Sequence, residues 1–238
     1  MSKTAPNINP PAARDLAAKP YKITILSDRK SWVRPYAKQL RNDFRALGHK
    51  CVCRYNTRSI GGGDFCFYLS YERIVSRNIL DRFRHNLVVH ESDLPRGKGW
   101  SPLTWQIMNG LKSIPIVIFE ASSKVDSGPI YYKSYLRFRG DELVDELRAQ
   151  QGCKTLELCR MFVRNYPTIV NSARSQKGNE SFYRRRRPSD SKLDLSKSLR
   201  DQFNLLRVVD NDRYPAFFRM FGKTYELHIK KQKCNESP

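Results

Sequence analysis

The sequence predicts an α/β fold in which a mainly parallel sheet carries helices on both faces. Two observations lead to this prediction. Short apolar runs alternate with segments whose apolar residues recur every three or four positions, as strands and amphipathic helices do in βαβ units. The chain has 238 residues, which is enough for one sizeable domain and a small appendage.

The alternating elements occupy the first two thirds of the chain and give a Rossmann-like order. Apolar runs predict strands at 21–27, 51–56, 64–71, 86–90 and 114–121. Helical spacing predicts helices at 31–50, 76–85, 104–111 and one or two over 141–166. In such sheets ligands bind beyond the carboxyl ends of the strands, and His90 stands at one of these ends.

The composition changes after about residue 175. The polar stretch "SQKGNESFYRRRRPSDSKLD" predicts a linker, which a helix at 197–209 and a β-hairpin over 214–231 would follow. The hairpin is expected to turn at 221–223. We therefore expect a flexible leader (1–19), a main domain (20–175), and a linker with a small C-terminal subdomain (176–238).

The chain is strongly basic, with 44 Lys and Arg against 23 Asp and Glu and a formal net charge of +21. This charge favours polyanionic partners such as nucleic acid or a phosphorylated substrate, although a generally basic surface explains it nearly as well. No apolar run is long enough to cross a bilayer, and the N-terminus lacks the apolar core of a secretion signal. We expect a cytoplasmic protein with no membrane span.

The six cysteines show no C-x-x-C spacing. In a domain of this size without an export signal, reduced thiols are expected, and no metal site is predicted. The cysteines are Cys51, Cys53, Cys66, Cys153, Cys159 and Cys234.

His90 and Asp126 form the candidate catalytic pair. An imidazole titrates near neutrality, so it can accept and return a proton during attack on a carbonyl. A carboxylate on a neighbouring strand's exit loop would hold that imidazole in one tautomer and favour its charged form. The alternative is an ordinary half-buried histidine and an aspartate that forms a turn before Gly128. The spacings of a serine-hydrolase elbow and of a P-loop are both missing.

The motifs "HESDLPRGKGWSPLTWQI" and then "VDSGPI" resemble the histidine loop and the downstream D-x-G loop of the 10-formyltetrahydrofolate-dependent formyltransferases. The later segment "FYRRRRPSDSKLDLSKSLRDQFNLLRVVDNDRYPAFFRMFG" is similar to the start of the C-terminal region in these enzymes. The resemblance spans roughly residues 60–225. It implies that residues 20–175 are a catalytic domain that transfers a formyl group from 10-formyltetrahydrofolate to an amine.

The resemblance also implies residue roles. His90 would act as general base and oxyanion partner, supported by Asp126. Folate would be bound largely through the main chain around Ser92, Leu94, Pro95, Glu120 and Val125. The acceptor substrate would be bound by Asp93, Lys98, Trp100, Trp105, Arg185 and Arg186.

The chain departs from the family at one position near the histidine. The family usually has an asparagine two residues before it, where this chain has Val88. Asn86 lies on the same face of a regular strand but about 13 Å from His90 at about 3.3 Å per residue. It would share a catalytic role with His90 only if the strand bulged. A main-chain N–H or a water is the alternative oxyanion donor.

The acceptor amine is expected to belong to a nucleotide-linked amino sugar, with UDP as the nucleotide. Only about sixty residues follow the linker, which is short for a tRNA-binding domain, and Trp100 and Trp105 look more like the sugar N-formyltransferases. Two alternatives stay open, namely a methionyl-tRNA formyltransferase and a non-catalytic RNA-binding protein on this scaffold. Nucleic acid therefore stays open as a partner. A homodimer is also an open possibility.

Overall fold

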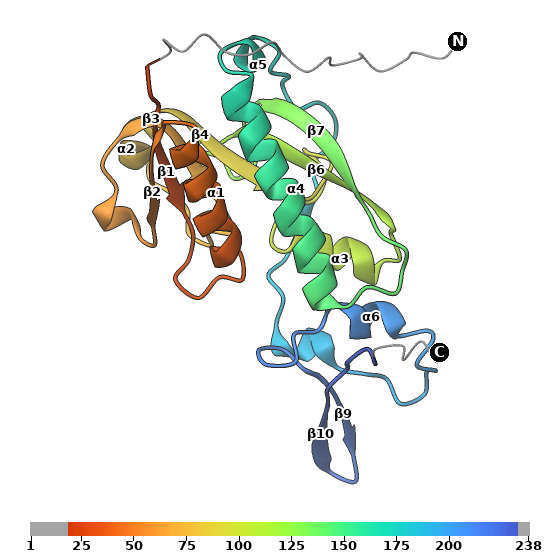
Figure 1. The fold of residues 1–238 in the computed structure, drawn as a ribbon. Helices are drawn as coiled ribbons and strands as arrows, with labels where there is room; N and C mark the ends of the chain where they lie inside the picture. The colour runs from red at the N-terminus through yellow and green to blue at the C-terminus, as the bar shows by residue number, and fades with distance from the viewer. Residues whose placement is uncertain (1–18, 233–238) are drawn as a thin grey trace, which may run out of the picture.

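The computed structural model describes residues 19–232. Except for residue 19, the predicted leader lies outside the described residues, as does Cys234. A six-stranded sheet in the order β2-β1-β3-β4-β6-β7 forms the centre of the molecule (Figure 1). Its strands are β1 Lys22–Leu26, β2 Lys50–Arg54, β3 Gly63–Tyr68, β4 Phe83–His90, β6 Ser113–Glu120 and β7 Ile130–Arg137.

The sheet is mostly parallel, as predicted. Strands β2, β1, β3 and β4 run parallel, whereas β6 pairs antiparallel with β4, and β7 pairs antiparallel with β6. The change of direction therefore falls at β4, the strand that ends in His90. The fold is a Rossmann-like α/β sheet with a small C-terminal hairpin.

Helices cover both faces of this sheet. The helices are α1 Arg34–Ala46, α2 Arg77–Leu80, α3 Pro102–Met108, α4 Val144–Arg164, α5 Thr168–Asn171 and α6 Phe203–Val208. Helices α1 and α4 pack on the face that presents Phe65 and Phe67, and α2 packs on the face that presents Cys66 and Tyr68. This alternation follows from the two-residue period of a strand, and burying each large apolar side chain contributes roughly 1.5–3 kcal/mol.

Two small strand pairs complete the fold. Strand β5 (Lys98–Gly99) pairs with β8 (Phe182–Tyr183), and β9 (Ala216–Met220) pairs with β10 (Lys223–Leu227). The β9–β10 hairpin projects beyond α6 (Figure 1) and turns at Phe221 and Gly222, as predicted. No helix within residues 19–232 is long and apolar enough to cross a membrane. Five of the six cysteines lie in this range and are free thiols.

Two predicted helices were wrong in detail, and one strand was missed. The predicted helix at 76–85 ends at Leu80, because Phe83 is buried and pairs with β3 as the start of β4. The helix predicted at 197–209 begins only at Phe203. Strand β7 was not predicted, because its tyrosines and basic residues do not alternate cleanly between buried and exposed positions.

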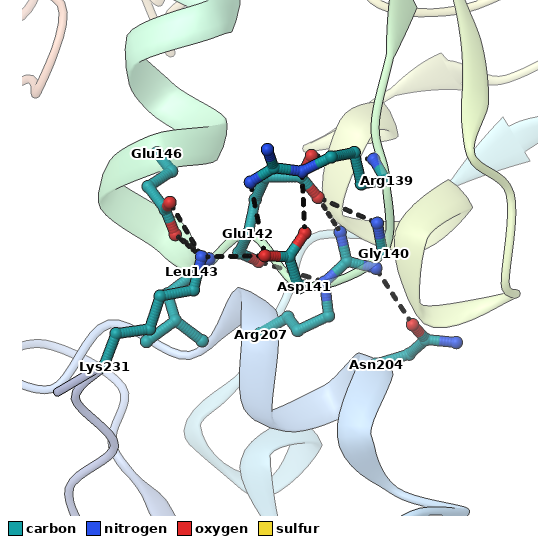
Figure 2. Close-up of polar contacts among 9 residues, drawn as sticks. All are labelled: Arg139, Gly140, Asp141, Glu142, Leu143, Glu146, Asn204, Arg207 and Lys231. Atoms are coloured by element: carbon teal, nitrogen blue, oxygen red, sulfur yellow. Dashed lines mark hydrogen bonds and ion pairs between the residues drawn. The ribbon is translucent and has the colours of Figure 1, made fainter. Parts of the chain in front are cut away.

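A buried ion pair joins the C-terminal part to the main domain (Figure 2). Arg207 of α6 donates to the main-chain oxygen and to Oε2 of Glu142, both at 3.0 Å. Both side chains are almost completely buried. Burial alone raises the pKa of Glu142, but N–H donors of Arg139 and Gly140, together with Arg207, outweigh it and leave this pKa below its usual value.

Replacing Arg207 with methionine is expected to lower the free energy of unfolding by about 3 kcal/mol, because Glu142 would stay buried without its cation. Urea denaturation at neutral pH measures this change. The matched control is Arg139→Met, which breaks an exposed pair with Asp141 and should lower the free energy of unfolding far less. Equal costs for both variants would show that the buried pair does not anchor the C-terminal part.

The contribution of Glu142 to the free energy of unfolding should also depend on pH. Its pKa is lower in the folded state than in the unfolded chain, where a glutamate titrates near about 4.3. The stabilisation is therefore complete above the unfolded value and is lost as pH falls through the folded value. In Glu142→Gln this part of the acid sensitivity should disappear.

Candidate active site

A cavity of about 640 Å³ opens beside the end of β4. Its walls come from segments that lie far apart in the sequence, including the loops after β1 and β3, helix α4 and the segment after α6. Of the predicted site residues it is lined by His90, Trp100, Val125, Asp126, Arg185 and Arg186.

His90 is the last residue of β4 and is 6% exposed. Its Nε2 lies 2.8 Å from the main-chain oxygen of Gly97 and 3.9 Å from Oδ2 of Asp126. The Gly97 oxygen accepts a hydrogen bond from Nε2–H, so the lone pair of the neutral ring is on Nδ1, and the Asp126 carboxylate lies at ion-pair distance from Nε2. The predicted pairing of histidine and aspartate is therefore present in the structure.

Asp126 lies on the loop between β6 and β7 in a left-handed conformation, with φ of 47°. Its Oδ2 accepts a hydrogen bond of 2.9 Å from the N–H of Gly99. Two residues later, Gly128 packs so closely on the main-chain oxygen of Glu120 that a Cβ there would lie 1.8 Å from it. Only glycine therefore fits this position of the D-x-G motif.

The histidine loop contributes main-chain groups to the same pair. Gly97 supplies the oxygen beside His90, and Gly99 supplies the N–H that binds Asp126. Both glycines have positive φ, 72° and 92°, which other residues adopt at a cost. These two glycines were not among the predicted site residues, although their spacing in "RGKG" was visible in the sequence.

The side chain of Asn86 does not contact His90. Its side chain accepts from the Tyr68 hydroxyl at 2.8 Å and donates to the main-chain oxygen of Leu80 at 2.9 Å, and it does not line the cavity. Val88, at the position where the family usually has asparagine, does line the cavity. The predicted catalytic role of Asn86 has no support from this geometry.

Most of the predicted folate residues do not line the cavity. Leu94 packs on Val117 and Phe119, and Ser92 is buried beneath the loop. Glu120 accepts hydrogen bonds from Asn86 N–H at 2.6 Å and from the Tyr131 hydroxyl at 2.5 Å. Ser92, Leu94, Pro95 and Glu120 do not line the cavity, whereas Val125 does.

The predicted substrate residues divide into two groups. Trp100 lines the cavity with the Arg185 guanidinium 4.6 Å from its ring centre, and Arg186 lines it as well. Asp93 pairs with Lys133 away from the cavity. Trp105 also lies outside, where its indole N–H donates to the main-chain oxygen of Arg184.

Lys98 was predicted to bind substrate and instead lies within the protein. Its side chain is 1% exposed, and Nζ donates to Glu180 at 2.6 Å and to the Ser127 hydroxyl at 2.7 Å. It does not line the cavity. The lysine therefore connects the β6–β7 loop to the segment after α5.

The cavity is also lined by residues that were not predicted, among them Glu91, Arg148 and Asp210. Glu91 follows His90, and burial raises the pKa of its carboxyl group, although the nearby His90 opposes the rise. Arg148 and Asp210, which also line the cavity, form an ion pair of 2.8 Å. Glu91 lies inside the histidine motif, whereas no motif marks Arg148 and Asp210, because this part of the cavity combines α4 with a segment about sixty residues later. Among the described residues, no group of three or more His, Cys, Asp and Glu could hold a metal ion.

Comparison with known proteins shows what this chain is similar to. Residues 61–155 match the formyl transferase family. The methionyl-tRNA formyltransferase of Finegoldia magna is 25% identical over 119 residues, which are 50% of this chain and 38% of that protein. The bifunctional polymyxin resistance protein ArnA of Wigglesworthia glossinidia brevipalpis is 26% identical over 67% of this chain and 25% of its own length. The chain thus spans well under two thirds of these curated relatives.

Solved structures share the fold over nearly the whole chain. Methionyl-tRNA formyltransferase from Clostridium thermocellum has a TM-score of 0.74 at 20% identity, covering 90% of this chain and 95% of that one. A 4-N formyltransferase from Francisella tularensis has a TM-score of 0.65 at 16% identity, covering 90% and 98%. HypX from Aquifex aeolicus in complex with tetrahydrofolic acid has a TM-score of 0.74 at 15% identity, covering 89% and 38%. Residues 61–155 therefore resemble the formyl transferase family, and the described chain has the fold of these formyltransferases.

Proposed function

We propose that the protein transfers the formyl group of 10-formyltetrahydrofolate to the amine of a nucleotide-linked amino sugar. The observation that carries this proposal is the His90–Asp126 pair, which lies at the end of β4 and lines the cavity. The match of residues 61–155 to the formyl transferase family supports the reaction class. The tetrahydrofolate complex of HypX, a protein of the same fold, supports the donor.

The cavity suits a folate. Its volume of about 640 Å³ lies within the usual range for small-molecule sites. Val88, Val89 and Phe119 give it an apolar wall, and the main chain of 121–126 gives it polar groups. An apolar wall beside main-chain donors and acceptors fits a flat heterocycle that carries hydrogen-bonding edges. The bound folate would supply the reactive formyl carbon.

His90 has two tasks in this reaction. The neutral ring can accept the proton of the attacking amine at Nδ1, because Nε2–H donates to the Gly97 oxygen. The resulting imidazolium faces the carboxylate of Asp126 and can stabilise negative charge on the formyl oxygen. The proton then passes to the departing folate nitrogen as the bond from that nitrogen to the formyl carbon breaks.

The acceptor would lie between Trp100 and the C-terminal segment. Arg185 and Arg186 line this part of the cavity and supply positive charge suited to a diphosphate. The shared fold of the Francisella tularensis 4-N formyltransferase supports a sugar amine. Methionyl-tRNA is the second candidate acceptor, because a curated relative that matches half of the chain is a methionyl-tRNA formyltransferase.

His90→Asn should lower turnover by about 10²- to 10⁴-fold, because the proton acceptor is lost. Initial rates with a saturating donor measure the loss, and circular dichroism verifies the fold. His228→Asn is the control, since His228 is exposed on the segment after the hairpin. Near wild-type turnover in His90→Asn would remove His90 from the mechanism.

Asp126→Asn should reduce kcat strongly while tetrahydrofolate binding changes much less. The amide oxygen can still accept from the N–H of Gly99, so the loop keeps its place, but it cannot favour an imidazolium. Steady-state rates and calorimetric titration with tetrahydrofolate separate the two effects. Weak folate binding with unchanged turnover at saturation would make Asp126 a folate ligand only.

The acceptor is identified by offering the full chain a panel of UDP-linked amino sugars and, separately, methionyl-tRNA, with 10-formyltetrahydrofolate as donor. We expect a sugar product that carries one added formyl group, measured by mass spectrometry. A diphosphate contacts only a few basic side chains, so the sugar reaction should respond weakly to salt. Formylation of the tRNA, with no product from any sugar of the panel, would show that methionyl-tRNA is the acceptor. Inactivity with both would favour a non-catalytic role.

A further inference from the structure

Residues 174–183, here called the strap, cross both loops of the active site. At one end, Arg174 exchanges two main-chain hydrogen bonds with Ile130, of 2.8 and 2.9 Å. At the other end, Ser181 accepts from Lys98 N–H at 2.9 Å, and Tyr183 accepts from Trp100 N–H at 3.0 Å. The first part of the predicted linker is therefore hydrogen-bonded to the histidine loop.

Gln176 is the strap residue that reaches the Asp126 loop. Its side-chain NH₂ donates to the main-chain oxygens of Asp126 and Gly128, each at 2.9 Å. Only the NH₂ end of a glutamine amide can satisfy two carbonyl oxygens, which fixes its orientation. Both hydrogen bonds connect residues about fifty positions apart, so no local structure replaces them.

The Asp126 loop depends on such contacts from outside. It contains no helix or strand between β6 and β7, and Asp126 has a left-handed backbone that costs free energy in a residue other than glycine. Besides Gln176, the bonds that reach it from other segments include Gly99 N–H to the Asp126 carboxylate and Lys98 Nζ to Ser127. Gln176 is the side chain that bonds the main chain on both sides of Ser127.

We propose that Gln176 is a positioning residue, which holds the Asp126 loop so that the carboxylate stays beside His90. It does not line the cavity, so it acts through Asp126 and not on the substrate. The inference rests on the proposed function for its catalytic consequence. The holding of the loop itself is independent of that function.

A double-mutant cycle tests the catalytic consequence. Gln176→Met keeps the length of the side chain but removes both donors, and kcat for the acceptor identified above should fall by roughly tenfold, the scale of one or two net hydrogen bonds. KM for the acceptor should change little. In an Asp126→Asn background the same substitution should cause almost no further loss, because the two residues act as a unit.

Gln202→Met is the matched control. Gln202 also donates to main-chain oxygens, those of Asp194 and Lys197, but in the C-terminal part away from the site. It should leave kcat unchanged. A tenfold loss from Gln176→Met in both the wild-type and the Asp126→Asn backgrounds would show a general structural effect and would overturn the proposal.

Hydrogen–deuterium exchange tests the strap without any reaction. Peptides covering 121–129 should exchange faster in Gln176→Met than in the wild type or in Gln202→Met, while those from α1 and α4 stay unchanged. Unchanged exchange of 121–129 would overturn the proposal. If the wild type formylated no acceptor, the proposed function would fail, and the exchange result alone would decide whether Gln176 holds the loop.

Discussion

The antiparallel pairing of β4 with β6 sets the constraint on which the site depends. His90 lies opposite Val117, and Leu87 lies opposite Glu120, so the chain leaves β6 three residues away from the histidine. The loop after β6 starts beside Asn86 and still has to bring Asp126 to within 3.9 Å of His90. In an all-parallel sheet both side chains would follow strand ends at one edge. Here the loop has to fold back, and it needs contacts from other segments to stay there.

Main-chain groups and residues outside the matched family segment meet that constraint. Gly97 and Gly99 adopt left-handed conformations that direct one oxygen to the histidine and one N–H to the aspartate. The strap then bonds both loops from a position beyond residue 155, where the family match ends. The Arg207–Glu142 pair anchors the C-terminal part, whose segment after α6 forms a wall of the cavity. The candidate site is therefore assembled from nearly the whole described chain.

The sequence was sufficient to select His90 and Asp126, which the structure places 3.9 Å apart, and insufficient for the groups that surround them. Strand periodicity placed His90 at the end of β4, and the spacing of D-x-G marked the loop of Asp126. Lys98 and Gln176 could not be assigned in this way, because their partners lie 82 and about 50 positions away and no motif connects them. The role predicted for Lys98 rested on its charge, but its side chain is buried and bonds to Glu180 and Ser127. The sequence alone showed that Val88 departs from the family pattern, and the structure adds that this residue lines the cavity.

A crystal structure with a stable 10-formyl folate analogue tests the central claim most directly. The reacting groups of a productive complex lie about 3–3.5 Å apart. The formyl group is therefore predicted to lie in the cavity next to Nδ1 of His90, with the heterocycle against the main chain of 121–126. Binding of the analogue elsewhere on the molecule, or in this cavity with its formyl group directed away from His90, would contradict the assignment of the His90–Asp126 pair as the centre that transfers the formyl group.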